Sequence, residues 1–385
     1  MEFYPTRYTP SHNWSSEQNA IFVEVGMWYR SQWFPLPGET HWRQSVDREV
    51  RQTRSSVGIC DVTTLGKIDI KGEDVSEFLN KVYANAFAKV PVGKTRYGLM
   101  LREDGIAMDD GTTARMSENH FVMTTTTANA VNVYRHLQFC HQCLWPDLDV
   151  HMISVTEQFA QYAVAGPNSR KLLEKIVDPE CDISNEAFPY MAAGEITVCG
   201  GTSARLFRIS FSGELAYEIA VPTRYGDSLM RVLMEAGEEF NVIPYGTEAL
   251  GVMRIEKGHA AGPELNGQTS AYDLGMGGMI SGKKDFIGYT LGLREDLQRD
   301  DRLQMVGFKP VNPNDLLLAG SHLLGLRDKA TTENDQGWIS SCIYSPILGH
   351  YIGLGFIKGG HNRKGENIRA VDLVRGNDVE VEICS

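Results

Sequence analysis

The alternation of apolar and polar residues predicts the same order of elements twice. Residues 66–72 alternate as a half-buried strand, and a helix with one apolar face follows from a cap at Asp74. Residues 162–166 form a similar strand, and Asn168 or Ser169 caps a helix whose apolar residues have the same spacing. The pattern therefore predicts two related α+β modules.

Hairpin-rich stretches and further helices complete these modules. The second helix of the first module is expected at about 127–143, and that of the second module at about 225–237. Residues 247–257 predict another helix, which is apolar on most sides and therefore buried, and which Gly258 ends. The glycine-rich stretch 262–288 predicts a loop.

The two ends of the chain differ from this middle part. The first residues, to about position 50, are rich in tryptophan and proline and predict an irregular segment that wraps onto a later sheet. After a charged linker at 294–302, short strands alternate with turns, as in a small β-barrel or jelly roll. We therefore expect an α+β region over residues 1–293, with modules at roughly 51–150 and 151–260, and a C-terminal β-barrel domain over 303–385.

Two predicted hairpins carry the candidate chemistry. The turn Glu-Asp-Gly at 103–105 separates two apolar runs, and the returning strand delivers Asp109 and Asp110. The turn Ser-Gly-Glu at 212–214 does the same for a strand that carries Glu218. If the modules are duplicates, these hairpins correspond to each other, and Asp110 and Glu218 face one cleft.

Composition excludes several classes of protein. A net charge of −12 argues against a general nucleic-acid or anionic-membrane binder. No window approaches the roughly 18 continuous apolar residues of a membrane span, and no secretory signal is visible. The seven scattered cysteines indicate reduced thiols in a cytoplasmic protein. Cys140 and Cys143 have the spacing of a zinc or redox site, but no second pair of ligands follows, so no metal site is expected.

Three segments resemble the aminomethyltransferase family, whose founding member is the glycine cleavage T-protein. They are Tyr-Gly-Leu-Met-Leu-Arg-Glu-Asp-Gly from Tyr97, Met-Asp-Asp-Gly-Thr-Thr-Ala-Arg from Met108, and His-Phe-Val-Met-Thr-Thr-Thr-Thr-Ala-Asn-Ala from His120. These segments are characteristic of the folate-binding C-terminal half of the α subunit of heterotetrameric sarcosine oxidase, whose dinucleotide-binding half this sequence lacks. The resemblance covers nearly the whole chain. It implies a three-domain cloverleaf with tetrahydrofolate in a central hole and the barrel as the third leaf.

The resemblance also assigns roles to individual residues. In the family a tyrosine lies thirteen residues before the catalytic aspartate, which selects Tyr97 and Asp110. The family's Tyr-Thr-Gly-Glu-x-x-x-Glu motif ends in the pterin-binding glutamate, which matches Glu218. The first tyrosine of that motif is Phe211 here, so the hydrogen bond of its hydroxyl is lost. The family's Arg-Leu-Glu element matches Arg254 and the two residues after it.

The chemistry of these side chains agrees with the implied roles. A carboxylate at Glu218 accepts the 2-amino group and the ring N–H of a reduced pterin together, and such charge-assisted pairs are about twice as strong as neutral ones. A carboxylate at Asp110 stabilises the charge on a folate nitrogen that attacks a one-carbon unit, or accepts its proton. The ring of Tyr97 is expected to pack against one face of the pterin. Asp109 and Arg254 complete the set of candidate binding residues. No metal or nucleophilic side chain is needed, because folate is the nucleophile.

Each residue taken alone also has an ordinary structural interpretation. Asp110 lies before a glycine and fits a turn or a strand end, and Glu218 fits a solvated strand face. Arg254 on a buried helix fits a structural ion pair, with Glu256 or Glu248 as its partner. Only the joint spacing of these residues, matched to the family pattern, favours the functional interpretation.

The resemblance implies a tetrahydrofolate-dependent one-carbon transferase. The expected reaction accepts a methylene group from an oxidised N-methyl amino acid, of the sarcosine or dimethylglycine type, and yields 5,10-methylenetetrahydrofolate. Because free imines hydrolyse readily, a flavin oxidase partner subunit is expected to deliver the imine. One alternative is methyl transfer that yields 5-methyltetrahydrofolate. Another is a non-enzymatic folate-binding regulator, which is disfavoured because the sequence Lys-Gly-His at 257–259 lacks the cysteine of that group. The sequence also fits a part of a larger oxidase.

Overall fold

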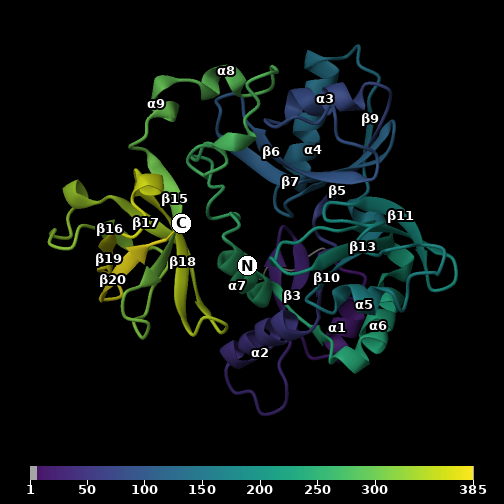
Figure 1. The fold of residues 1–385 in the computed structure, drawn as a ribbon, viewed down its shortest axis with the longest axis horizontal. Coiled ribbons are helices and arrows are strands. Elements are labelled where there is room, and N and C mark those ends of the chain that lie inside the picture. The colour runs from purple at the N-terminus through teal and green to yellow at the C-terminus, as the bar shows by residue number, and fades with distance from the viewer. Residues whose placement is uncertain (1–6, 385) are drawn as a thin grey trace. The chain divides into compact units, whose positions relative to one another are not determined.

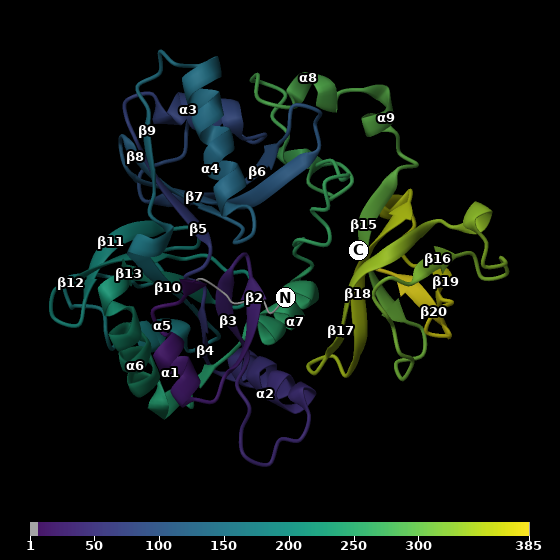
Figure 2. The same ribbon diagram turned by 180° about the vertical axis from the view of Figure 1, so that it is seen from behind.

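The computed structural model describes residues 7–384 of the chain and contains two compact units, which Figures 1 and 2 show from opposite sides. The first unit comprises the residues as far as Val82, Ala86–Gly98 and Asp109–Gly251. The second comprises Tyr83–Asn85, Leu99–Met108 and the residues from Val252 onward. Two short stretches from the first part of the sequence therefore belong to the second unit.

From Arg7 onward the N-terminal segment forms regular structure, so the expectation of an irregular segment is wrong for the described residues. The elements are β1 (Arg7–Tyr8), α1 (His12–Glu17), β2 (Ile21–Val25), β3 (Trp28–Trp33) and α2 (Trp42–Ser55). Gly26 and Met27 have positive φ between β2 and β3, as a tight hairpin turn requires. The aromatic residues that suggested irregular packing are common in strands. Trp14 and Phe34 do pack with the core of a later sheet, as predicted.

The first large sheet has five strands in the order β6-β7-β8-β5-β9. These are β5 (Gly66–Lys71), β6 (Lys94–Leu101), β7 (Ala107–Ser117), β8 (His120–Thr125) and β9 (His151–Ser154). Helix α3 (Val75–Val82) follows β5, α4 (Ala130–Phe139) follows β8, and a π-helical turn, Cys140–Leu144, extends α4. The predicted strand at 66–72 and the helix after Asp74 are confirmed, and the helix predicted at 127–143 begins slightly later.

The second large sheet has six strands in the order β11-β12-β13-β10-β4-β14. These are β4 (Gly58–Asp61), β10 (Phe159–Ala165), β11 (Ala193–Val198), β12 (Thr202–Phe207), β13 (Ala216–Pro222) and β14 (Ile243–Pro244). Its helices are α5 (Ser169–Leu173) and α6 (Gly226–Ala236). Short 3₁₀ turns lie at Thr156–Gln158, Thr223–Tyr225 and Glu238–Phe240. The predicted strand and both helices of this module are confirmed.

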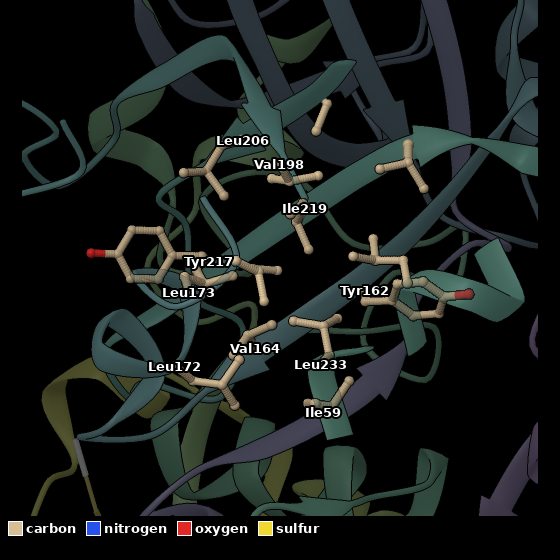
Figure 3. Close-up of a cluster of buried hydrophobic side chains, with 14 of the residues drawn as sticks. Ile59, Tyr162, Val164, Leu172, Leu173, Val198, Leu206, Tyr217, Ile219 and Leu233 are labelled. Atoms are coloured by element: carbon tan, nitrogen blue, oxygen red, sulfur yellow. The ribbon is translucent and has the colours of Figure 1, made fainter. Parts of the chain in front are cut away.

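One face of the six-stranded sheet carries the core of the unit, which Figure 3 shows. Tyr162 of β10 and both Tyr217 and Ile219 of β13 pack there with Leu172 of α5 and Leu233 of α6. Because successive side chains of a strand point to opposite faces, the residues between these core positions project from the other face of the sheet. Glu218 is one of them.

The two sheets share one topology. β5, β6, β7 and β8 with their helices correspond in order to β10, β11, β12 and β13, which confirms two related α+β modules. Each sheet takes one strand from the sequence next to the other module. Strand β4, which directly precedes β5, pairs with β10 of the second sheet, and β9, which precedes β10, pairs with β5 of the first sheet. The expected correspondence of the two hairpins is wrong. Asp110 lies on β7, the equivalent of β12, whereas Glu218 lies on β13, the equivalent of β8. Each module contains two successive hairpins, β6–β7 and β7–β8 in one and β11–β12 and β12–β13 in the other, and the two turns marked by the sequence belong to hairpins that are not equivalent.

The faces of the two sheets that the helices leave free meet each other. Asp69 of β5 forms a two-pronged ion pair with Arg205 of β12, with N–O distances of 2.8 and 2.7 Å. An apolar cluster joins the same two sheets and contains Ala114, Val122, Ala193, Phe207 and Ile209. The first unit is therefore a layered structure of helices, two sheets and helices.

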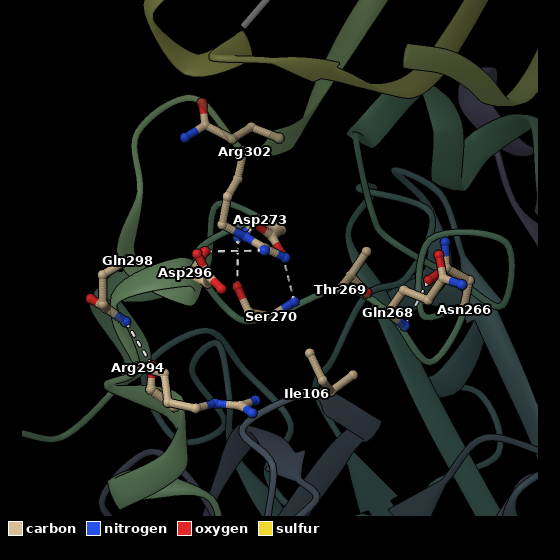
Figure 4. Close-up of polar contacts among 12 residues, drawn as sticks. Ile106, Asn266, Gln268, Thr269, Ser270, Asp273, Arg294, Asp296, Gln298 and Arg302 are labelled. Carbon is tan, nitrogen blue, oxygen red and sulfur yellow. Dashed lines mark hydrogen bonds and ion pairs between the residues drawn. The ribbon is translucent and has the colours of Figure 1, made fainter. Parts of the chain in front are cut away.

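The long C-terminal part of the second unit starts within α7 (Thr247–Lys257). The bounds of α7 are those predicted, and Gly258 with φ of +81° ends it. A largely irregular stretch follows, with a 3₁₀ turn at Gly277–Met279 and the short helices α8 (Tyr289–Gly292) and α9 (Glu295–Gln298). Figure 4 shows a contact that holds this irregular stretch in place. Arg302 binds the buried carboxylate of Asp273 with two hydrogen bonds of 2.8 and 2.7 Å. None of the helices within residues 7–384 has the length and apolar character needed to cross a membrane.

The predicted C-terminal β-barrel is confirmed as a closed barrel of order β15-β18-β17-β16-β19-β20. Its strands are β15 (Leu303–Pro310), β16 (His322–Leu324), β17 (Gly337–Ser345), β18 (His350–Lys358), β19 (Asn367–Asp372) and β20 (Asn377–Ile383), with 3₁₀ turns at Thr332–Asn334 and Gly360–Asn362. Inward side chains such as Phe308, Ile339 and Val381 fill it. The α+β fold class with a C-terminal barrel is thus correct.

Candidate active site

Asp110 lies on β7 beside Tyr97 of β6. The Tyr97 hydroxyl donates to Oδ2 of Asp110 at 2.7 Å. Burial raises the pKa of Asp110 to about 6; the Tyr97 hydrogen bond opposes this shift, and the charge of Asp109 adds to it. Burial beside the two carboxylates also raises the pKa of Tyr97, so its hydroxyl stays protonated. Asp110 is thus a carboxylate suited to accept a proton near neutral pH.

Asp109 points to the opposite face of the sheet from Asp110. Its carboxylate accepts hydrogen bonds from the Thr126 hydroxyl at 2.6 Å, the Thr126 backbone N–H at 3.2 Å and the Asn129 amide at 3.3 Å. These bonds tie β7 to the chain that leads into α4, and Asp109 is only 2% exposed. The described contacts therefore give Asp109 a structural role, and its assignment to the binding set stays a prediction.

Glu218 lies within β13 and is 8% exposed. The Gln161 side-chain amide donates to Oε2 of Glu218, and no other residue within 7–384 donates to this carboxylate. Burial raises the pKa of Glu218, while the Gln161 hydrogen bond and the charge of Lys67 oppose the rise. Since an ionised carboxylate can accept about four hydrogen bonds, most of the acceptor capacity of Glu218 is unused.

Asp110 and Glu218 lie on facing sides of the two sheets. Glu218 projects away from the core that Tyr217 and Ile219 occupy, and hence toward the five-stranded sheet. Ala114 of β7 packs in the apolar cluster that joins the sheets. Asp110 lies an even number of residues away on the same strand, so its side chain points to the same face of the sheet. Both carboxylates therefore point toward the layer between the sheets, one from each side.

Arg254 belongs to a buried ion pair in the second unit. Its guanidinium donates to Glu264 at 2.9 Å, to the His259 carbonyl at 3.0 Å and to the Ser341 hydroxyl at 2.7 Å. The sequence predicted Glu256 or Glu248 as the ion-pair partner of Arg254, and this prediction is wrong. Glu256 instead accepts a hydrogen bond from Ser345 of the barrel. The pterin-binding role of Arg254 stays a prediction.

Sequence reasoning missed Gln161 and Lys67, which act on Glu218. Both occupy polar positions of alternating strands, a pattern that ordinarily marks the solvated face of a sheet. Lys67 is nevertheless 2% exposed, because a second sheet covers that face. The only sequence signal for their burial was the duplication itself, which predicts two sheets that can pack on each other.

The Cys-x-x-Cys segment lies in the π-helical turn after α4. Cys140 is buried, with Sγ 3.5 Å from Nε2 of His136, whereas Cys143 is exposed. His141 contacts the Leu148 carbonyl at 3.0 Å. Across the described part of the chain, no three His, Cys, Asp or Glu side chains gather as metal ligands would.

Comparison with known protein families gives two matches that together span most of the chain. The GCVT N-terminal domain matches residues 11–284, and the glycine cleavage T-protein C-terminal barrel domain matches residues 304–385. The chain therefore belongs to the glycine cleavage T-protein family. This confirms the predicted family and the predicted class of aminomethyltransferase-like enzymes.

Individual relatives agree with this assignment. The chain is 52% identical to the sarcosine oxidase subunit alpha of Rhizobium meliloti over all of its own length, but spans only 39% of that protein. It is 26% identical to the aminomethyltransferase of Chloroherpeton thalassium, with 91% of each chain covered. The dimethylglycine dehydrogenase of Mus musculus is 29% identical over 68% of this chain and 31% of that protein.

A solved structure has the same fold. The glycine cleavage system aminomethyltransferase T from Bartonella henselae superposes with a TM-score of 0.83 at 21% identity, covering 98% of this chain and 96% of that one. At this identity the likeness establishes the fold alone. The site must be argued from the residues of this chain.

Proposed function

We propose that this chain catalyses tetrahydrofolate-dependent one-carbon transfer. In this proposal Glu218 binds the pterin ring, and Asp110 lies beside the folate nitrogen that takes up the one-carbon unit. The observation that carries the proposal is the pair of carboxylates on facing sides of two sheets, each with a raised pKa. Raised pKa values of this kind cluster at functional sites, because burying a carboxylate without a full set of donors destabilises a protein.

The donor edge of a reduced pterin fits Glu218. Its 2-amino group and ring N–H are neighbouring donors, and a buried carboxylate with unused lone pairs accepts both. Gln161 holds one oxygen of Glu218, which fixes the plane of the carboxylate before a ligand arrives. Preorganised acceptors of this kind bind more tightly, since little ordering is left to be done on binding.

Asp110 is suited to a position beside the reacting nitrogen of the folate. When bound, tetrahydrofolate supplies the nitrogen that takes up the one-carbon unit. The carboxylate of Asp110 stabilises the positive charge that develops there and accepts the released proton. The Tyr97 hydroxyl holds Oδ2 of Asp110 at 2.7 Å and so orients the carboxylate. Tyr97 further contributes an aromatic wall to the pterin.

The one-carbon donor in this proposal is an oxidised N-methyl amino acid, and the product is 5,10-methylenetetrahydrofolate. The methylene carbon gives up its bond to the amino-acid nitrogen, and the demethylated amino acid leaves as the free amine. The similarity to sarcosine oxidase subunit alpha and to dimethylglycine dehydrogenase supports this class of donor. Because the chain spans 39% of the first of these relatives, the oxidation that forms the imine is assigned to a flavin oxidase partner or to a further part of the same protein.

The decisive experiment is an anaerobic titration of the full chain with tetrahydrofolate. We expect binding by the wild type and a loss of affinity of about 10-fold or more in Glu218→Gln, because hydrogen bonds to charged groups contribute about 1.5–3 kcal/mol. Glu195→Gln is the matched control, since Glu195 is an exposed glutamate on the same sheet. Absence of binding by the wild type, or equal binding by both variants, would contradict the proposal.

A second measurement tests the reaction. Methyl-labelled sarcosine with a cognate oxidase should label 5,10-methylenetetrahydrofolate in proportion to the amount of this protein. Labelled 5-methyltetrahydrofolate instead would favour methyl transfer, because the two products differ in mass.

A further inference from the structure

Lys67 is a buried cation with one unused hydrogen bond beside the Glu218 carboxylate. Its ammonium group donates to the Thr63 carbonyl at 2.5 Å and to the Leu65 carbonyl at 3.0 Å. An ammonium has three N–H donors, and the third has no partner within residues 7–384. A buried donor without a partner is costly, so this N–H indicates a ligand or water site.

The direction of Lys67 follows from the strand that carries it. Lys67 and Asp69 share one side of β5, and Asp69 reaches across to Arg205 of the second sheet. Lys67 therefore projects into the same layer between the sheets as Asp110 and Glu218.

A chain of contacts connects Lys67 to Glu218. Lys67 holds the carbonyl of Thr63, and the Thr63 hydroxyl accepts the backbone N–H of Gln161 at 2.9 Å. Gln161 in turn donates to Glu218. Lys67 and Glu218 also act on each other's charge without forming an ion pair. The unused donor of Lys67 and the unused acceptors of Glu218 thus belong to one small polar cluster.

We propose that Lys67 donates its third N–H to the 4-oxo oxygen of the pterin whose neighbouring edge Glu218 holds. This inference rests on the proposed function. In a pterin the 2-amino group, the ring N–H and the 4-oxo group follow one another along one edge, in the order donor, donor, acceptor. A carboxylate beside a cationic donor is complementary to that order, and Lys67 makes the site specific for 4-oxo rather than 4-amino pterins.

The charge of Lys67 supports this role. Burial lowers the pKa of Lys67 to about 8, while the nearby carboxylates of Asp61, Glu218 and Glu157 oppose the fall. The amine therefore stays largely protonated at pH 7, and it keeps a third N–H group beside the two that bind the Thr63 and Leu65 carbonyls.

The test compares two ligands on three proteins. Dissociation constants are measured for tetrahydrofolate and for 4-amino-4-deoxytetrahydrofolate, whose 4-amino group offers a donor where Lys67 requires an acceptor. The proteins are the wild type, Lys67→Met, which keeps an unbranched side chain but removes the ammonium group, and Lys71→Met. Lys71 is an exposed lysine at the end of the same strand and serves as the control.

We expect the wild type and Lys71→Met to prefer the 4-oxo ligand by about 10- to 100-fold, the range of a charge-assisted hydrogen bond. Lys67→Met should lose the part of that preference that Lys67 provides. The remaining part is due to Glu218, because the ring nitrogen next to the 4-amino group carries no N–H for its carboxylate to accept. If Lys67→Met does not fold, Lys67→Gln, which keeps a neutral N–H donor, should show a reduced preference.

Two outcomes overturn the inference and leave the proposed function intact. In one, the wild type binds both ligands equally well. In the other, Lys67→Met weakens both ligands by the same factor, which means that Lys67 acts only through Glu218. If the wild type binds neither ligand, the proposed function itself fails, and this inference fails with it.

Discussion

Two buried polar clusters of this protein differ in how completely their hydrogen bonds are satisfied. In the second unit, Glu264 accepts from Arg254 and the Ala261 N–H on one oxygen, and from the Ser340 and Ser341 hydroxyls on the other. In the first unit, one neighbouring side chain holds Glu218 and one holds Asp110. The saturated cluster stabilises the fold, whereas the unsaturated carboxylates are suited to a ligand.

A bulge in the barrel explains how the saturated cluster is built. The register of β17 against β18 shifts between Ile339 and Ser341, and both Ser340 and Ser341 donate to Glu264. An extra residue in a strand re-aims side chains, so two consecutive serines reach one carboxylate. Regular alternation would have turned one of them away.

The largest expected effect concerns Asp110. Asp110→Asn keeps the shape of the side chain but removes the proton acceptor, so the rate of one-carbon transfer should fall by about 10²- to 10⁴-fold. Binding of tetrahydrofolate should change little. Asp109→Asn is the matched comparison, since its contacts to Thr126 and Asn129 predict a loss of stability rather than of rate. Equal rates in the wild type and Asp110→Asn would exclude Asp110 as the base.

The next effect tests the saturated cluster. Arg254→Met leaves the buried carboxylate of Glu264 without its cation, and breaking a buried pair in this way typically costs about 3–5 kcal/mol of the free energy of unfolding. Urea unfolding of the full chain measures this loss. If Arg254→Met keeps the wild-type stability but no longer binds tetrahydrofolate, Arg254 belongs to the binding set as the family resemblance implied.

A smaller effect links Asp110 to the pH dependence of stability. Its pKa is about 6 in the folded chain and about 3.9 in an unfolded one, so the folded state binds the proton more tightly. The wild type should therefore gain stability relative to Asp110→Asn as the pH falls from 7 to 4, by about 2–3 kcal/mol. Unfolding curves of both proteins at the two pH values give this difference, and the opposite sign would show that the folded site favours the charged carboxylate.

The smallest effect concerns Tyr97. Transfer by the wild type should fall about tenfold per pH unit below pH 6, where Asp110 becomes protonated. Tyr97→Phe removes the hydrogen bond that stabilises the ionised form, so the acid limb of the pH–rate profile should move upward by about one pH unit. If the acid limb of the profile does not move, the Tyr97 hydroxyl does not influence the pKa of Asp110.

Much of the fold could be predicted from local pattern. The bounds of α7, the strand–helix pairs at β5 and β10, and the C-terminal barrel all follow from spacing that neighbouring residues determine. The N-terminal hairpin was missed, because aromatic residues suit irregular packing and strands alike. Helix α2 was missed with it.

The sequence alone determined which carboxylates lie on hairpin strands, and the family motif selected Asp110 and Glu218 among them. Tertiary structure decided which surfaces meet: it exchanged β4 and β9 between the modules, buried Lys67, joined Gln161 to Glu218 and paired Arg254 with Glu264. The physical reason is that alternation within a strand divides its side chains between two faces, but pairing between distant segments decides what covers each face.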